Sequence, residues 1–363
     1  MLVAAYAPLK PPDHPIPSGD RRVARLIEAA LVRAGHRVEW PSRFRSRDGA
    51  GNRLRQLRLA LLGGHLADRM LRKLAARPTS QRPQAWITYH LYYKAPDHLG
   101  PTVARGLGIP YIVVEASLAA KQMGGKWDMG HRAAVAALGQ ASAIVSLNPG
   151  DVSAVDAFRN PRVPHYLLPP FLAAESYAQS RPRTAPPARL LAVGMMRKGD
   201  KRRSYAVLAQ ALAQLKAPWQ LAIVGDGPAR AEIEADFAPF GDRVQFHGEC
   251  NEAQMAALRA ASDIYVWPAI GEAFGMALLE AQASGLPAVA GFTQGVAAIV
   301  ADGQTGLLAT LGDAAEFAQA LATLCVDPGL RAKMGRSAFA KVRDRHDIAG
   351  AADLFDRILR RQA

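Results

Sequence analysis

The 363-residue chain has only two cysteines, Cys250 and Cys325, which lie far apart and form no C-x-x-C pair. This scarcity indicates neither a disulfide framework nor a zinc site. No apolar run approaches the roughly 18 residues that a membrane span requires. The first residues, MLVAAYAPLKPPDHP, have no basic start and reach prolines early, unlike a signal peptide. These absences predict a cytosolic protein.

Acidic residues are scarce relative to basic ones, 31 against 45, which gives a formal charge of +14. Such an excess favours an anionic partner or surface. Residues 43–82 alone hold eleven basic residues and two acids, and their central part, 51–77, reads as a helix. The apolar residues of that helix form two stripes, Leu54, Leu57 and Leu61, then Leu66, Met70 and Leu74.

Two interpretations of segment 51–77 remain open. A basic amphipathic helix can lie on an anionic membrane surface. It can equally be an ordinary surface helix that packs its leucines inward and exposes its arginines. The region has no interleaved aromatic residues and matches no nucleic-acid motif, so we expect no nucleic-acid partner.

Short apolar segments alternate with helical patterns along the whole chain, which is typical of parallel sheets covered by helices. A chain of this length suggests two domains. We expect an N-terminal domain over 1–172, a proline-rich linker over 173–187, a C-terminal domain over 188–347, and a last amphipathic helix, 348–363, that returns to the first domain. Doubly wound sheets of this kind bind ligands at the carboxyl ends of their strands.

The segment VGMMRKGDK begins with Gly194 at the end of a predicted strand and presents Arg197 and Lys201. It lacks the Lys-Ser/Thr pair of a P-loop, so we do not expect a nucleotide triphosphatase. Two cations at the carboxyl end of a strand suit a diphosphate, although surface cations are also ordinary in a basic protein. A later segment, AIVGDGPARAE, lacks the third glycine of a dinucleotide site and does not predict nicotinamide binding.

The segment GEAFGMALLEAQASGLPAVA places Glu280 among apolar residues of a helix that begins near Gly275. None of its neighbours three or four residues away is basic, and a carboxylate in such a place is costly unless it is hydrogen-bonded. A nucleoside diphosphate accounts for the pattern, because its phosphates suit a helix N-terminus and its ribose diol suits a carboxylate. Glu272 would then lie near the group on the distal phosphate.

The run DIYVWPAIGEAFGMALLEAQASGLPAVA, followed by TQGVAAIVADGQTGLLA, resembles the donor-site signature of glycosyltransferase family 4. The resemblance covers roughly 188–345 and includes LAVGMMRKGDK, LAIVGDGPARAEIE and RVQFHGEC in the expected order. It implies an α/β GT-B fold, in which two Rossmann-like doubly wound domains face a central cleft. It also implies sugar transfer from a nucleotide-sugar with retention of anomeric configuration.

The resemblance further implies a role for each matching position. Glu280 would hold the ribose hydroxyls and Glu272 the donor sugar, while Arg197 and Lys201 would neutralise the departing diphosphate. The remaining donor-binding positions are Gly194, Phe246, Phe274, Gly275 and Met276. No cofactor or metal is expected, because the sequence has no Asp-x-Asp pair to hold a metal–diphosphate complex.

The N-terminal half resembles the family less closely. Gly19, in SGD, lies where the family has a glycine-rich loop near the phosphate and the acceptor. The family often has a histidine after a strand like YIVVEAS, where this chain has Glu115 and Ala116. His90, at the end of AWITYH, is a second candidate for the reaction centre. Both His90 and Glu115 also fit purely structural roles.

Together these observations predict a metal-independent glycosyltransferase that uses a nucleotide-diphosphate sugar. The basic segment 51–77 suits a lipid-linked or cell-envelope polysaccharide acceptor and a peripheral place on the inner face of a membrane. The alternative is a catalytically inactive GT-B nucleotide-binding protein that supports a partner enzyme.

Overall fold

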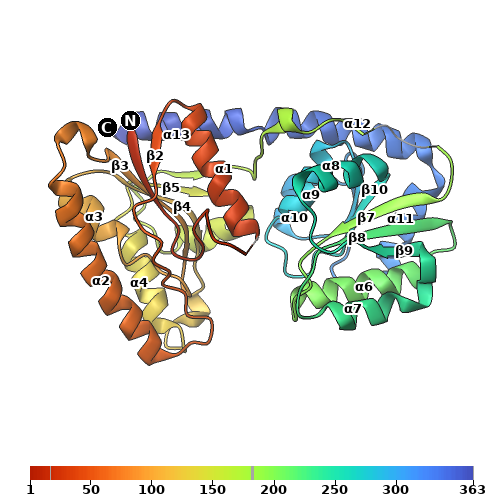
Figure 1. The fold of residues 1–363 in the computed structure, drawn as a ribbon, viewed down its shortest axis with the longest axis horizontal. Coiled ribbons are helices and arrows are strands. Elements are labelled where there is room, and N and C mark those ends of the chain that lie inside the picture. The colour runs from red at the N-terminus through yellow and green to blue at the C-terminus, as the bar shows by residue number, and fades with distance from the viewer. Residues whose placement is uncertain (17, 181–183, 363) are drawn as a thin grey trace. The chain divides into compact units, whose positions relative to one another are not determined.

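The computed structural model describes residues 1–16, 18–180 and 184–362. The chain divides into two compact units, Met1–Leu168 together with Ile348–Ala363, and Pro169–Asp347 (Figure 1). The first unit therefore ends four residues before the expected boundary at 172, and the expected linker 173–187 belongs to the second unit. Residues 181–183 of that linker lie outside the described residues.

The N-terminal unit is built on a six-stranded parallel sheet in the order β2-β1-β3-β4-β5-β6. Its strands are β1 (Leu2–Tyr6), β2 (Arg37–Glu39), β3 (Ala85–Tyr92), β4 (Tyr111–Ser117), β5 (Ala143–Ser146) and β6 (His165–Leu167). The sequence pattern predicted all of these strands except β6, which is only three residues long. The order reverses between β1 and β3, so the loops after these two strands diverge to opposite faces of the sheet.

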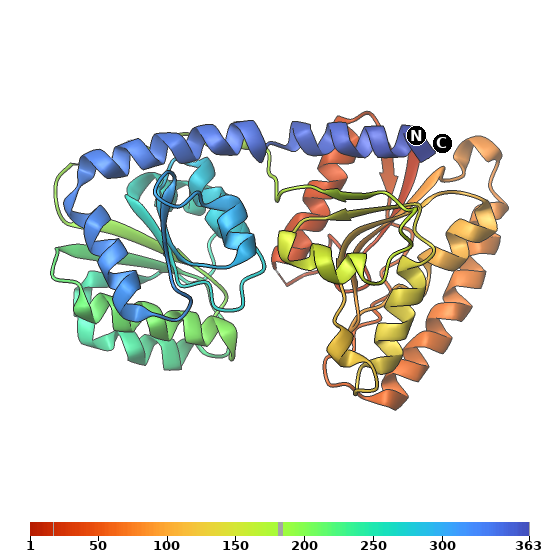
Figure 2. The same cartoon turned by 180° about the vertical axis from the view of Figure 1, so that it is seen from behind.

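Helices cover both faces of this sheet (Figures 1 and 2). They are α1 (Gly19–Arg33), α2 (Arg53–Ala75), α3 (Gly100–Leu107), α4 (Asp128–Leu138), α5 (Val152–Asp156) and α13 (Ile348–Gln362). Helix α13 packs against α1, and its Asp356 lies 3.2 Å from Nε2 of His36. Helices α2, α3 and α4 close a core on the other face around Trp86 and Tyr111.

The two leucine stripes of α2 lie in different surroundings. Leu54 and Leu61 are each 67% exposed and Leu57 is 44% exposed, so the first stripe faces solvent. The second stripe packs inward, with Leu74 only 1% exposed. Inward packing is therefore wrong for the first stripe and confirmed for the second. No helix in the described ranges is both long enough and apolar enough to span a bilayer.

The C-terminal unit has a second six-stranded parallel sheet in the order β12-β11-β10-β7-β8-β9. Its strands are β7 (Ala188–Val193), β8 (Trp219–Val224), β9 (Val244–Phe246), β10 (Ile264–Trp267), β11 (Ala288–Gly291) and β12 (Gly306–Ala309). Its helices are α6 (Asp200–Gln214), α7 (Arg230–Phe237), α8 (Glu252–Ala261), α9 (Met276–Ala283), α10 (Gln294–Ile299), α11 (Ala314–Val326) and α12 (Pro328–Arg345). The strand order reverses between β7 and β10, which makes their carboxyl ends the expected ligand-binding edge.

Candidate functional site

The reversal point of the C-terminal sheet brings Lys201 and Glu272 together. Lys201 lies in the first turn of α6, which follows β7, and Glu272 lies in the loop after β10. The Lys201 ammonium forms an ion pair with Glu272 Oε2, across 71 residues of sequence. Trp267, the last residue of β10, donates its indole N–H to the same oxygen at 3.1 Å, and the ammonium lies 5.0 Å from the centre of its ring. Charge and hydrogen bonds therefore fix both side chains before any ligand arrives.

The loop between β10 and α9 is held tightly against α6. The N–H of Ile270 donates to Ser204 Oγ at 3.0 Å. Gly271 has a left-handed φ of 63°, and a Cβ atom there would lie 2.2 Å from a carboxylate oxygen of Asp200, so a side chain at this position would be strained. Ala269 adopts a left-handed φ of 59°, which is unfavourable for a residue with a side chain. Such strain is often found at functional sites, where the surrounding structure maintains it.

Helix α9 begins directly after this loop, as the sequence predicts. Its N-cap is Gly275, with φ at 78°, and no side chain caps the first turn. The first N–H groups of a helix lack partners within the helix, and the helix dipole favours an anion there. Phe274 and Gly275 are half-buried, whereas Met276 is buried. Glu272 lies near this N-terminus, because a Cβ atom on Gly275 would come within 3.4 Å of Cγ of Glu272.

Glu280, in the second turn of α9, has a cationic neighbour that the sequence did not reveal. Nη1 of Arg259, in α8, lies 3.7 Å from Glu280 Oε2. Arg259 belongs to another helix and comes 21 positions earlier in the chain, so it is not among the helical neighbours of Glu280. Glu280 is thus compensated in part by a protein group.

The other predicted donor residues occupy less specific positions. Arg197 is exposed on the loop between β7 and α6, and within the described ranges no carboxylate pairs with it. Gly194 lies under Trp267, because a Cβ atom there would come within 2.6 Å of the indole ring. Phe246 ends β9 with its ring centroid 6.1 Å from that of Phe237, so at least part of its role is packing.

The reversal point of the N-terminal sheet gathers the remaining candidates. Gly19 is the first residue of α1. The carboxylate of its neighbour Asp20 lies within hydrogen-bond distance of Nδ1 of His90, at 2.9 Å. Nε2 of His90 lies 3.4 Å from Ser117 Oγ. Asp20 was missed in the sequence, although it lies within the SGD segment that drew attention to Gly19.

His90 and Glu115 lie side by side on β3 and β4 in an unusual backbone conformation. Their φ angles are 61° and 62°, left-handed values that are rare for residues with side chains. The flanking register pairs are Tyr89 with Val114 and Leu91 with Ala116. Both strands therefore kink at the same level. The Glu115 carboxylate is turned to accept the N–H of Leu147 at 2.7 Å.

Electrostatic coupling links this group of side chains. Burial lowers the pKa of His90, but the hydrogen bond and negative charge of Asp20 outweigh it, so the net pKa is raised. Burial raises the pKa of Glu115 to about 7, against the opposing effects of His90 and the Leu147 N–H. Burial also raises the pKa of Asp151, which lies near Glu115. The group can therefore exchange protons near neutral pH, a property shared by many reaction centres.

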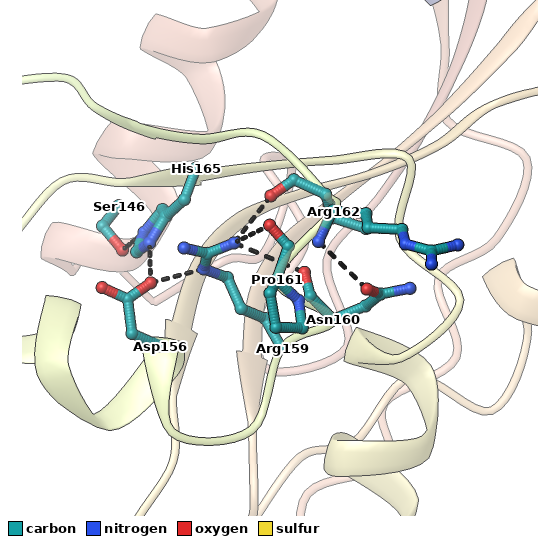
Figure 3. Close-up of polar contacts among 8 residues, drawn as sticks. Ser146, Asp156, Arg159, Asn160, Pro161, Arg162 and His165 are labelled. Atoms are coloured by element: carbon teal, nitrogen blue, oxygen red, sulfur yellow. Dashed lines mark hydrogen bonds and ion pairs between the residues drawn. The ribbon is translucent and has the colours of Figure 1, made fainter.

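A Ser–His–Asp arrangement also occurs in the N-terminal unit (Figure 3). Ser146 Oγ lies 2.9 Å from Nε2 of His165, and Nδ1 of His165 lies 2.9 Å from Asp156. Arg159 binds the same carboxylate and donates to the carbonyl of Val163 at 2.8 Å. Ser146 is fully buried in β5, so its hydroxyl cannot reach a substrate. These hydrogen bonds attach the edge strand β6, and the loop before it, to β5 and to the end of α5.

Part of the C-terminal unit is similar in sequence to known glycosyl transferases. Residues 187–327 match the family model described as Glycosyl transferases group 1. A D-inositol 3-phosphate glycosyltransferase of Streptomyces avermitilis is 35% identical over 143 residues, which are 38% of this chain and 31% of that protein. The matched segment thus spans only about a third of that curated relative.

Two solved structures share the fold across nearly the whole chain. Sucrose-phosphate synthase of Thermosynechococcus elongatus superposes with a TM-score of 0.77 at 19% identity, over 99% of both chains. HepE of Anabaena, in complex with UDP, gives a TM-score of 0.74 at 17% identity, over 99% of this chain and 100% of that one. Residues 187–327 are therefore similar in sequence to the group 1 glycosyl transferases, and the two doubly wound units have the GT-B fold.

Proposed function

We propose that the chain is a glycosyltransferase that moves a hexosyl group from a nucleotide-diphosphate sugar to an acceptor with retention of configuration. The observation that carries the proposal is the Lys201–Glu272 pair, held at the reversal point of the C-terminal sheet beside the N-terminus of α9. The match to group 1 glycosyl transferases supports it, and so does the UDP bound by the similar structure of HepE.

Each residue of the C-terminal site has a chemical role in this proposal. Negative charge accumulates on the diphosphate as the glycosidic bond breaks, and Lys201, Arg197 and the N-terminus of α9 stabilise it. These groups need neither a metal nor a cofactor. Glu272 accepts hydrogen bonds from the donor sugar, and Glu280 accepts them from the ribose diol. In the N-terminal unit, Gly19, His90 and Glu115 would serve the acceptor side.

Nucleotide binding tests the proposal directly. Among UDP, GDP, ADP and CDP, we expect one to stabilise the wild type in a thermal melt without divalent metal. A ligand at about 100 times its Kd contributes roughly 2.7 kcal/mol. The Glu280→Ala variant should lose most of this stabilisation, because the ribose loses its acceptor. Excess EDTA should leave the wild-type shift unchanged.

The matched control is Asp242→Ala, which removes an exposed carboxylate at the amino end of β9 and should respond to nucleotide like the wild type. If no nucleotide shifts the wild type, the donor-site proposal is wrong. If Glu280→Ala responds like the wild type, Glu280 serves only as a partner for Arg259.

A second candidate function is a GT-B nucleotide-binding protein that supports a partner enzyme without transferring sugar. The observation in its favour is Glu115, which lies where the family often has a histidine. The two functions differ in one measurement. An active transferase releases free nucleotide from a nucleotide-sugar. An inactive binding protein is stabilised by nucleotide in a thermal melt but releases none from a nucleotide-sugar.

We further propose that the acceptor is lipid-linked, or an envelope polysaccharide intermediate, and is met at an anionic membrane surface on the cytoplasmic side. The first half of α2 supports this. Its exposed leucines, Leu54, Leu57 and Leu61, are interleaved with the exposed Arg53, Arg55 and Arg58. Leucines can enter the headgroup boundary while arginines meet anionic lipids.

Charge reversal of Arg53, Arg55 and Arg58 to glutamate should abolish binding to vesicles that contain phosphatidylglycerol, as measured by co-sedimentation. Each basic residue near such a surface contributes about 1 kcal/mol. Reversal of Arg69, Arg72 and Lys73, exposed on the second half of the same helix, is the matched control and should have a smaller effect. Binding that persists in the first variant would contradict the membrane proposal.

A further inference from the structure

Arg259 is the buried residue of α8, with 4% of its surface exposed, and it lies between two carboxylates. Nη1 is 3.7 Å from Glu280, and Nη2 is 3.2 Å from Glu252. The guanidinium carbon also lies 5.1 Å from the centre of the Tyr177 ring. Its Nε and Nη1 have no hydrogen-bond partner within the described part of the chain.

Arg259 interacts more strongly with one of these two carboxylates than with the other. The Glu252 side chain is 66% exposed, so water screens its attraction to the cation. The Glu280 side chain is 16% exposed, and charges separated from water interact more strongly. The electrostatic effect of Arg259 therefore falls mainly on Glu280.

Packing alone does not explain an arginine at this position. Burying a guanidinium carries a large desolvation cost, and an apolar side chain of similar volume is often as stable or more so. The position of Arg259 becomes intelligible if the carboxylate beside it must remain charged and correctly oriented. Arginine suits that task because its guanidinium is charged at every physiological pH and is rigid and planar.

We propose that Arg259 is a positioning residue that holds the Glu280 carboxylate ionised and oriented to accept both hydroxyls of the donor ribose. The inference rests on the proposed function, because it assigns Glu280 to the ribose. Arg259 acts only through Glu280. The Tyr177 ring, 5.1 Å from the guanidinium carbon, packs beside Arg259, and Arg343 donates to the main-chain carbonyl of Tyr177 at 3.1 Å.

A ribose-specific binding experiment tests this role in the full chain. The probes are the nucleoside diphosphate that binds tightest among UDP, GDP, ADP and CDP, and its 2′,3′-dideoxy analogue. Calorimetric titration should show that Arg259→Met weakens the ribonucleotide by about tenfold, the loss of one hydrogen bond to a charged acceptor. The affinity for the dideoxy analogue, which makes no such bond, should be nearly unchanged.

Three variants make the result specific. Glu252→Gln removes the other carboxylate and should leave both affinities as in the wild type. Combining Arg259→Met with Glu280→Gln should weaken the ribonucleotide no further than Glu280→Gln alone, because both changes act on one interaction. Arg259→Lys keeps the charge without the planar fork and should lie between the wild type and Arg259→Met. It also supplies the test if Arg259→Met does not fold.

The outcomes separate this inference from the proposed function. A wild type that binds none of the four nucleotides overturns both. A wild type that binds nucleotide, with the same ribonucleotide-to-dideoxy ratio after Arg259 is replaced, overturns the positioning role alone. The ratio stays the same when both probes weaken equally, which is the result expected if replacing Arg259 only disturbs the structure and does not act on the ribose hydroxyls.

Discussion

Replacing Lys201 with methionine is expected to lower the rate of nucleoside diphosphate release from a bound nucleotide-sugar by about 100- to 1,000-fold. The ammonium is aimed by its ion pair with Glu272 and by the Trp267 ring, at the edge where the diphosphate is expected to lie. Methionine keeps much of the side-chain length but cannot stabilise charge on the leaving group. Because the effect falls on the transition state, kcat should fall more than the affinity for the donor.

The rate is measured as free nucleotide released at saturating nucleotide-sugar. Lys198→Met is the matched control, because Lys198 is exposed on the same loop between β7 and α6. The Lys201–Glu272 pair is partly exposed, so its loss should cost at most about 1 kcal/mol of stability. An unchanged kcat in Lys201→Met would remove Lys201 from the proposed reaction.

The alternation of apolar strands and amphipathic helices predicted most of the two sheets. It missed β6 and β12, which have three and four residues. Strands this short show little periodicity, and β2 and β9, which have three residues each, were found because helical patterns flank them. The prediction for α2 left two alternatives open. Only the folded position of the helix shows that Leu54 and Leu61 face solvent while Leu74 is covered.

The sequence identified the candidate side chains better than their partners. Glu272 and Lys201 could be chosen from their positions at strand ends, but their pairing depends on which strands become neighbours. Arg259 and Asp20 were missed for the same reason, since each meets its partner through tertiary packing. The left-handed conformations of His90 and Glu115 also had no sequence signal, because residues with side chains rarely adopt them.

These conformations explain why the charges of Glu115 and His90 influence each other. The kink at equal levels of β3 and β4 brings an imidazole and a buried carboxyl into one group with Asp20 and Asp151. A buried carboxyl that ionises near pH 7 destabilises the folded state once it is charged. The folded state is stable at that pH only because the other interactions in the protein contribute more free energy than this charge costs.

We therefore compare the free energy of unfolding of Glu115→Gln with that of the wild type. The difference, variant minus wild type, is expected to be about 1–3 kcal/mol more positive at pH 8 than at pH 4.5. Burial raises the pKa of Glu115 to about 7, above its value in the unfolded chain. Between those two pKa values the unfolded wild type releases its proton first, so wild-type stability falls as the pH rises and then stays lower above pH 7. Glutamine resembles the protonated form and pays no such penalty.

Urea denaturation of wild type and Glu115→Gln at pH 4.5 and pH 8 measures the difference. The lower end of the expected range allows for His90, whose raised pKa depends in part on the charge of Glu115. Asp151→Asn should give a smaller change of the same sign, because burial raises the pKa of Asp151 as well. A glutamine effect that is equal at both pH values would mean that Glu115 is already charged well below pH 7. In that case the carboxyl acts as a fixed anion beside His90, and the proton exchange inferred for this site would have to come from His90 alone.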